Sequence, residues 1–151
     1  MNGYKTQADL FIKIETINRF TPEFTSDFYV YYIDENSAFN TTVGLLTAYD
    51  NDTLGDYGQL HYELNSAQNH LFAIEAKTGR IFTTSTRPKF ELDRESLDTF
   101  HMSVDAIDGG GLRKSVQVVI KLRDLNDNAP RFISNSWVKN NAAANNFSLS
   151  K

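Results

Sequence analysis

The sequence predicts an all-β fold, an antiparallel β-sandwich built from short strands. Apolar and polar residues alternate with a period of two in several segments, and turns rich in Asn, Asp, Ser or Gly separate these segments. Hydrophobic residues make up 40% of the 151-residue chain and aromatic residues 13%, which is enough to form a packed core. Because the sequence shows no long amphipathic helix, this core is expected between sheets.

The alternating segments follow one another along the chain, and each ends at a turn. In the first three the alternating apolar residues are Phe28, Val30 and Tyr32 before DENS, Val43 and Leu45 before AYDND, and Leu60, Tyr62 and Leu64 before NSAQN. FAIEAKTGRIFTT comes next, where Thr78 and Gly79 predict a hairpin-type turn between two strands. In the last two segments the apolar residues occupy every second position and are expected to face the core: Phe100, Met102, Val104 and Ala106, then Val116, Val118, Ile120 and Leu122.

Charge and composition exclude several classes of function. The net charge is -4 and no run of Lys or Arg forms a basic patch, so nucleic acid is not an expected partner. The chain has no cysteine, which excludes disulfides, Cys-ligated zinc and a thiol nucleophile. The opening MNGYKTQADLF lacks the apolar core of a secretory signal, and no segment has the roughly 20 apolar residues of a membrane helix. A signal and an anchor for an extracellular role would therefore lie beyond this sequence.

The two flanks of the chain share a pattern. ADLFIKIETINRFTPEF near the start resembles VQVVIKLRDLNDNAPRF near the end, since in both a strand leads to Asn, then Pro, a spacer and Phe. Pro22 and Pro130 are 108 residues apart, a spacing that fits one sandwich domain. We therefore expect residues 1–21 to be the last strand and linker of a preceding repeat, 22–132 a complete repeat, and 133–151 a truncated or disordered tail.

The acidic residues gather at turns. Asp and Asn favour turns for conformational reasons alone, so a single pair is uninformative. Calcium, however, takes 6 to 8 oxygen ligands from carboxylates, Asn side chains and backbone carbonyls. Several acidic turns that meet at one end of a sandwich would repel one another without cations and would suit calcium. The clusters are Asp34-Glu35-Asn36, Asp50 with Asp52, Asp93 with Glu95, Asp105 with Asp108, and Asp124 with Asn126, Asp127 and Asn128.

In order and spacing these motifs resemble the extracellular repeat of the cadherin superfamily, of a non-classical or protocadherin-like type. DLNDNAPRF at 124–132 matches the family's linker pattern DxNDNxPxF at each fixed position, and LDRE at 92–95 is the family's motif unchanged. The resemblance covers residues 22–132 and implies a seven-stranded Greek-key sandwich with immunoglobulin-like architecture. Further matching motifs are ENS at 35–37, TAYDND at 47–52, FAIEAKTGRI at 72–81 and VDAIDGG at 104–110.

The resemblance implies calcium sites at both ends of the repeat. A third ion at the C-terminal end would be shared with the next repeat through Asn126 and the backbone carbonyl of Asn128, and Pro130 would fix the direction of the chain. The other two ions there would be held by Glu35, Asp93, Glu95, Asp124, the backbone carbonyl of Leu125, and Asp127.

The N-terminal end departs from the family pattern. Thr16, Arg19 and Phe20 stand where the family has Asp, Asp and Asn. Among the ligand positions of this linker, only Asn18 is kept. A fixed positive charge at Arg19 should repel calcium. We therefore predict that two upstream sites are lost. One weak site is expected to remain, at Asn18, Asp50, Asp52 and Asp108.

The predicted function is that of a calcium-binding repeat on the extracellular side of the plasma membrane, in a protein of calcium-dependent, homophilic cell–cell adhesion. Its expected partners are other cadherin repeats, in cis or in trans, and a protein on an adjacent cell, with no small-molecule substrate. The alternatives are a non-adhesive spacer repeat with a flexible upstream linker, and a calcium-stabilised carbohydrate-binding module. An enzyme is not expected, because the pattern provides no aromatic-lined cleft between the paired carboxylates of a glycosidase.

The sequence also predicts a glycoprotein if the chain is secreted. Asn40-Thr41-Thr42, Asn51-Asp52-Thr53 and Asn146-Phe147-Ser148 match the acceptor pattern for N-linked glycans. Asn51 lies between two expected calcium ligands, so Asn40 is the better candidate of these two.

Overall fold

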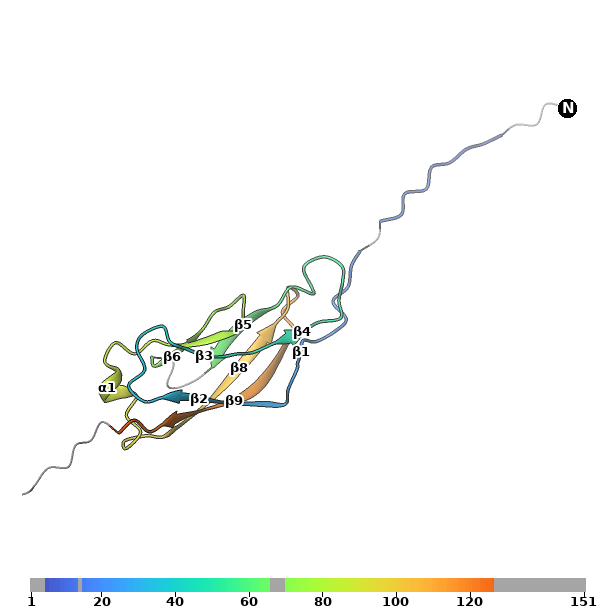
Figure 1. Ribbon diagram of the computed structural model, residues 1–151. Coiled ribbons are helices and arrows are strands. Elements are labelled where there is room, and N and C mark those ends of the chain that lie inside the picture. The colour runs from blue at the N-terminus through green and yellow to red at the C-terminus, as the bar shows by residue number, and fades with distance from the viewer. Residues whose placement is uncertain (1–4, 14, 66–69, 127–151) are drawn as a thin grey trace, which may run out of the picture.

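The computed structural model describes residues 5–13, 15–65 and 70–126, and within them the chain forms a sandwich of two sheets (Figure 1). The larger sheet has the strand order β2-β9-β8-β5 and the smaller β3-β7-β6, while β1 and β4 form a short pair. The predicted all-β sandwich is confirmed. The strands are β1 (Glu23–Phe24), β2 (Phe28–Asp34), β3 (Thr42–Leu45), β4 (Ala48–Tyr49), β5 (His61–Asn65), β6 (Phe72–Ile74), β7 (Arg80–Thr83), β8 (Thr99–Ile107) and β9 (Arg113–Arg123).

These strands correspond to the seven expected from the resemblance once two interruptions are recognised. Only residues 25–27 separate β1 from β2, and only residues 46–47 separate β3 from β4. The break between β1 and β2 lets the first strand change sheets. β1 pairs with β4, whereas β2 pairs with β9 in the four-stranded sheet.

One strand pair contradicts the expected antiparallel pairing. β2 and β9 run parallel, with Phe28 opposite Gln117 and Asp34 opposite Arg123. The other strand pairs of the described residues are antiparallel. The parallel pair arises because the first strand crosses to the edge of the sheet that contains the last strand. As a result β2 and β9 end side by side, and the residues that follow them lie at the same end of the sandwich.

The core lies between the two sheets. Every second residue of β8 and β9 points into it, as predicted, and the Phe72 and Phe100 rings meet edge to face at 5.2 Å between centroids. In β2 the sequence pattern singled out Phe28, Val30 and Tyr32 as the alternating apolar set, but the structure buries the other set. The structure turns Tyr29, Tyr31 and Ile33 inward, and leaves exposed Phe28, Val30 and Tyr32.

The turn predicted at Thr78 and Gly79 is present between β6 and β7. Gly79 has φ 73° and its N–H donates to the carbonyl of Glu75 at 3.0 Å. A Cβ atom there would lie 2.4 Å from the carbonyl oxygen of Leu46, so the position requires glycine for both conformation and space. The one helix of the described ranges is α1 (Pro88–Glu91), and no helix in them has the length and apolar character to cross a membrane.

The N-terminal segment and the end of β9 lie at opposite ends of the sandwich (Figure 1). Residues 5–13 and 15–22 form no strand, and Leu10 and Ile12 are 83% and 76% exposed. These two residues match the buried Val118 and Ile120 of β9 in the 108-residue repeat. The domain boundaries expected at residues 21 and 132 stay predictions, and the expected tail, 133–151, lies outside the described residues.

Candidate calcium-binding poles

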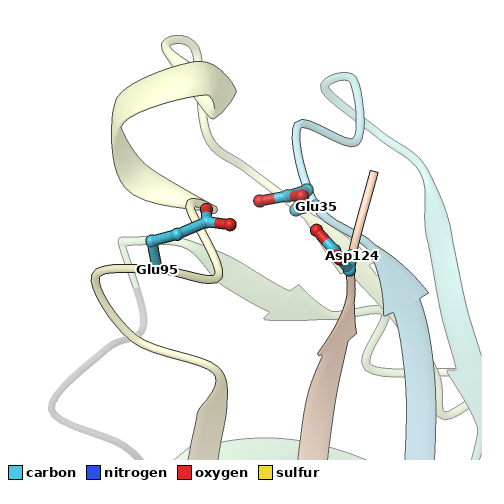
Figure 2. A group of neighbouring side chains, drawn as sticks. All are labelled: Glu35, Glu95 and Asp124. Atoms are coloured by element: carbon cyan, nitrogen blue, oxygen red, sulfur yellow. The ribbon is translucent and has the colours of Figure 1, made fainter. Parts of the chain in front are cut away.

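Three carboxylates from distant parts of the chain converge at the end of the sandwich where β2 and β9 finish. Glu35, Glu95 and Asp124 each place an oxygen within 4.8 Å of the others, and Figure 2 shows their side chains facing one another. We call this end the downstream pole. Glu35 directly follows β2, Asp124 directly follows β9, and Glu95 lies in the loop between α1 and β8. The parallel β2–β9 pair therefore brings two of the three together.

Glu35 is the buried member of the group, with 1% of its surface exposed. Its Oε1 atom accepts a hydrogen bond from the Leu125 N–H at 2.6 Å, and its Oε2 atom accepts one from the Arg94 N–H at 3.0 Å. Its own N–H donates to the Arg123 carbonyl at 3.0 Å. Glu35 thus ties together the ends of both strands and the loop that carries Glu95.

The pKa values of Glu35 and Glu95 at the downstream pole shift in opposite directions. The N–H groups of Arg94 and Leu125 lower the pKa of Glu35, because they stabilise its charged form. The pKa of Glu95 is lowered by its own backbone N–H. A side-chain hydrogen bond with Asp93, burial, and the negative charges of Glu35 and Asp93 oppose this and raise the Glu95 pKa overall. The negative charges of Glu35 and Asp93 contribute part of this increase in the Glu95 pKa, and a cation at this pole would offset that part.

The spacing of the three carboxylates suits a calcium ion. Calcium–oxygen distances are about 2.3–2.6 Å, so two oxygens on one ion lie at most about 5 Å apart. The 4.8 Å limit that contains Glu35, Glu95 and Asp124 meets this condition. Of the other expected ligands, Asp93 uses its oxygens for Ser96 and the Glu95 N–H, while Leu125 and Asn126 follow Asp124 on the surface. Asp127 and Asn128 lie outside the described residues.

The opposite end, the upstream pole, joins the N-terminal linker to the turns after β4 and β8. Asn18 donates from Nδ2 to Oδ2 of Asp108 at 2.9 Å. The Arg19 and Phe20 N–H groups both donate to Oδ2 of Asp52, each at 2.9 Å. The structure therefore brings the expected ligands Asn18, Asp52 and Asp108 to one end, where hydrogen bonds from the linker hold the two carboxylates.

Two oxygens at the upstream pole have no hydrogen-bond partner among the residues that the structure describes. They are Oδ1 of Asn18 and Oδ2 of Asp50, and both atoms are buried. Buried oxygens without a donor are costly, and a bound cation would satisfy them. Within the described ranges, however, no second group of three acidic residues brings its oxygens within 4.8 Å of one another. The upstream pole is therefore less well formed for a cation than the downstream pole.

Three features of the acidic turns and their surroundings were not predicted from the sequence. A Cβ on Gly110 would lie 2.1 Å from Nδ2 of Asn18, so this glycine makes room for the linker. The backbone N–H of Arg94 holds Glu35, which no side-chain pattern indicates. Asp105 belongs to neither pole, because it is held on the four-stranded sheet by Asn65, Arg113 and Ser115.

Comparison with known proteins identifies the fold family. The sequence model of the cadherin domain matches residues 29–123. The chain is 34% identical over 130 residues to cadherin-related family member 1 of Mus musculus, covering 86% of this chain and 15% of that protein. It is 36% identical over 140 residues to desmoglein-2 of Mus musculus, covering 85% of this chain and 12% of that protein. The chain thus spans a small part of the length of these relatives.

Solved structures agree with this assignment. PcdhgB3 EC1-4 superposes with a TM-score of 0.68 at 32% identity, over 76% of this chain and 27% of that chain. Mouse cadherin-23 EC22-24 gives a TM-score of 0.65 at 32% identity, over 74% of this chain and 35% of that chain. Cadherin domains are adhesion modules and not enzymes, so the prediction that the chain is not an enzyme is confirmed. The chain belongs to the cadherin family, and residues 29–123 are its cadherin domain.

Proposed function

We propose that this chain is a calcium-stiffened repeat of a cell-surface protein and acts in calcium-dependent cell–cell adhesion. The observation that supports this most directly is the convergence of Glu35, Glu95 and Asp124 at the downstream pole. Calcium bound there, with Asp93, the Leu125 carbonyl, Asn126, Asp127 and the Asn128 carbonyl as further ligands, would remove the carboxylate repulsion and hold the following segment in a fixed direction. The extracellular side of the membrane is the location that fits, as the solved protocadherin Gamma B2 domains are described as extracellular.

Calcium-dependent melting of the full chain tests the proposal. An ion that binds only the folded state stabilises it by about 2.7 kcal/mol when its concentration is a hundredfold above Kd. We expect calcium to raise the melting temperature of the wild-type chain, and the Glu35→Ala, Asp127→Ala double variant to lose most of that increase. Equal increases in both proteins would refute the ligand assignment. Magnesium at the same concentration controls for ionic strength.

A second candidate is a spacer repeat whose upstream linker acts as a hinge. It is favoured by Thr16, Arg19 and Phe20, which replace ion-binding residue types, and by the backbone hydrogen bonds that hold the linker to Asp52. At the upstream pole we propose a single weak ion at Asn18, Asp50, Asp52 and Asp108.

Beads coated with the chain distinguish the adhesive role from the spacer role. An adhesive repeat aggregates the beads in calcium, and polar substitutions of the exposed Phe28 and Tyr32 are expected to reduce this, whereas a spacer gives no aggregation.

A further inference from the structure

An acceptor triplet for N-linked glycans, Asn40-Thr41-Thr42, ends the loop between β2 and β3 and includes the first residue of β3. Asn40 is exposed and stands near the tip of the loop, where the Thr41 N–H donates to the Ala38 carbonyl at 3.2 Å. Its own N–H donates to the carbonyl of Thr83 at 2.8 Å, so the backbone is held in place. A side chain presented on a fixed, exposed turn can carry a large polar group without disturbing the core.

The side chains of Asn40 and Thr42 lie next to each other on the surface. Nη1 of Arg80 donates to both Oδ1 of Asn40 and Oγ1 of Thr42, each at 3.3 Å. Because a guanidinium group only donates, the Asn40 atom that faces Arg80 must be the oxygen. The amide nitrogen, to which a glycan is attached, therefore points away from Arg80, and it donates to no other residue in the described ranges.

Asn40 has a backbone reason to be present as well. Its φ is 64°, a left-handed conformation that asparagine tolerates better than most residues. That conformation explains Asn40 alone and does not require a hydroxyl residue at position 42. The second triplet is placed less well, since Asn51 lines a hollow with Arg19 and Phe20, and Asp52 between Asn51 and Thr53 binds the linker. The third triplet, at Asn146, lies outside the described residues.

We propose that Asn40 is a site of N-linked glycosylation, which rests on the extracellular location in the proposed function. In the transfer step the Nδ2 atom of Asn40 attacks C1 of an oligosaccharide carried on a lipid pyrophosphate. The new N–C bond replaces the C1–O bond, the lipid pyrophosphate leaves with that bond's electron pair, and Nδ2 loses one proton. The sugar then stands beside Phe39, which is 61% exposed, and keeps this corner of the β3-β7-β6 sheet from packing against a protein partner.

Secretion of the full chain from cultured animal cells behind an added leader tests the site. We expect a mass increment that peptide-N-glycosidase removes, leaving Asp in place of Asn at position 40 in peptide maps. Asn40→Gln and Thr42→Ala should lose this increment, while Thr42→Ser and Asn51→Gln should keep it. The Thr42 pair separates the acceptor requirement from folding, because both substitutions are small and Ser preserves the hydroxyl. An unmodified Asn40 in the secreted wild-type chain would overturn the proposal.

The same secreted protein separates this proposal from the one on which it rests. If Asn40 is unmodified but calcium still raises the melting temperature, the glycan assignment fails and the calcium-binding role stands. If Asn40 carries a glycan but calcium has no effect on melting, the calcium-binding role fails and the modification site stands. Asn51→Gln serves as the matched control for the glycan measurement, since it also changes an exposed loop asparagine to glutamine.

Discussion

Glu35 and Leu125, ninety positions apart in the sequence, are joined by a hydrogen bond of 2.6 Å from the Leu125 N–H to the Glu35 carboxylate. The other carboxylate oxygen of Glu35 accepts from the Arg94 N–H at 3.0 Å. Glu35 therefore has a role in the fold of the downstream pole in addition to its proposed role as a calcium ligand. The two roles can be separated by substitutions that remove the charge with or without the acceptor oxygen.

Glu35→Gln keeps one acceptor oxygen, whereas Glu35→Ala leaves the N–H groups of Arg94 and Leu125 without their carboxylate acceptor. In a calcium chelator we expect Glu35→Ala to be the less stable of the two by urea denaturation. In saturating calcium both variants should lose much of the stabilisation that the wild type gains, because neither has the carboxylate. Glu63→Gln, an exposed change on β5, should keep the wild-type calcium response. A full calcium response in Glu35→Gln would show that the carboxylate is not a ligand.

Arg19 carries a positive charge in the linker at the upstream pole, where its N–H binds Asp52. Reversing one unit charge about 10 Å from a divalent ion changes their interaction in water by roughly 1.7 kcal/mol. We therefore expect Arg19→Asp to tighten calcium binding at this pole by on the order of tenfold at low salt. Isothermal titration calorimetry measures the change in the Glu35→Ala, Asp127→Ala background, which removes two of the proposed ligands of the downstream pole.

Lys13→Asp is the matched control for Arg19→Asp, since it makes the same change of net charge on an exposed residue of the N-terminal segment. It should leave the affinity nearly unchanged. An equal gain in both variants would mean that calcium responds to net charge and not to the residue at position 19.

Much of the fold and of the poles could be predicted, and the exceptions have physical causes. The alternation of β8 and β9 was unambiguous because polar residues separate most of their apolar ones, and the buried sets were correct. In β2 both alternating faces are apolar or aromatic, and the set that the pattern singled out, Phe28, Val30 and Tyr32, is the exposed one. The meeting of Glu35 with Asp124 depends on the parallel β2–β9 pair, which is a property of topology and not of local pattern.

The core should depend strongly on Phe100, which is 1% exposed and packs edge to face on Phe72. Replacing a buried Phe with Ala removes its burial and leaves a cavity, at a cost of about 3–5 kcal/mol. We expect Phe100→Ala to lose stability of that size in urea denaturation followed by circular dichroism. Phe90→Ala in α1, where the ring is 78% exposed, should change stability by less than about 0.5 kcal/mol. Similar losses in the two variants would contradict this placement of the core.

Ser85 and Glu91 make stability depend on pH at α1, which directly precedes the loop that carries Glu95. The Ser85 hydroxyl donates to Oε2 of Glu91 at 2.5 Å, and this bond lowers the pKa of Glu91. A carboxylate with a lowered pKa contributes stability above the pKa of the unfolded chain, and the contribution is lost as the pH falls through the folded-state pKa. Ser85→Ala should therefore be less stable than the wild type at pH 7, and the gap should narrow on acidification.

The control for this pH dependence is Ser37→Ala. The Ser37 hydroxyl donates to the backbone carbonyl of Asp34, an acceptor that does not titrate, so its loss should cost the same at pH 7 and at pH 3. Urea denaturation of both variants at each pH gives the comparison. A gap for Ser85→Ala that stays constant with pH would show that its hydrogen bond does not stabilise the charged form of Glu91. The pKa of Glu91, followed by NMR, should also rise in Ser85→Ala, because the donor that favours the carboxylate is gone.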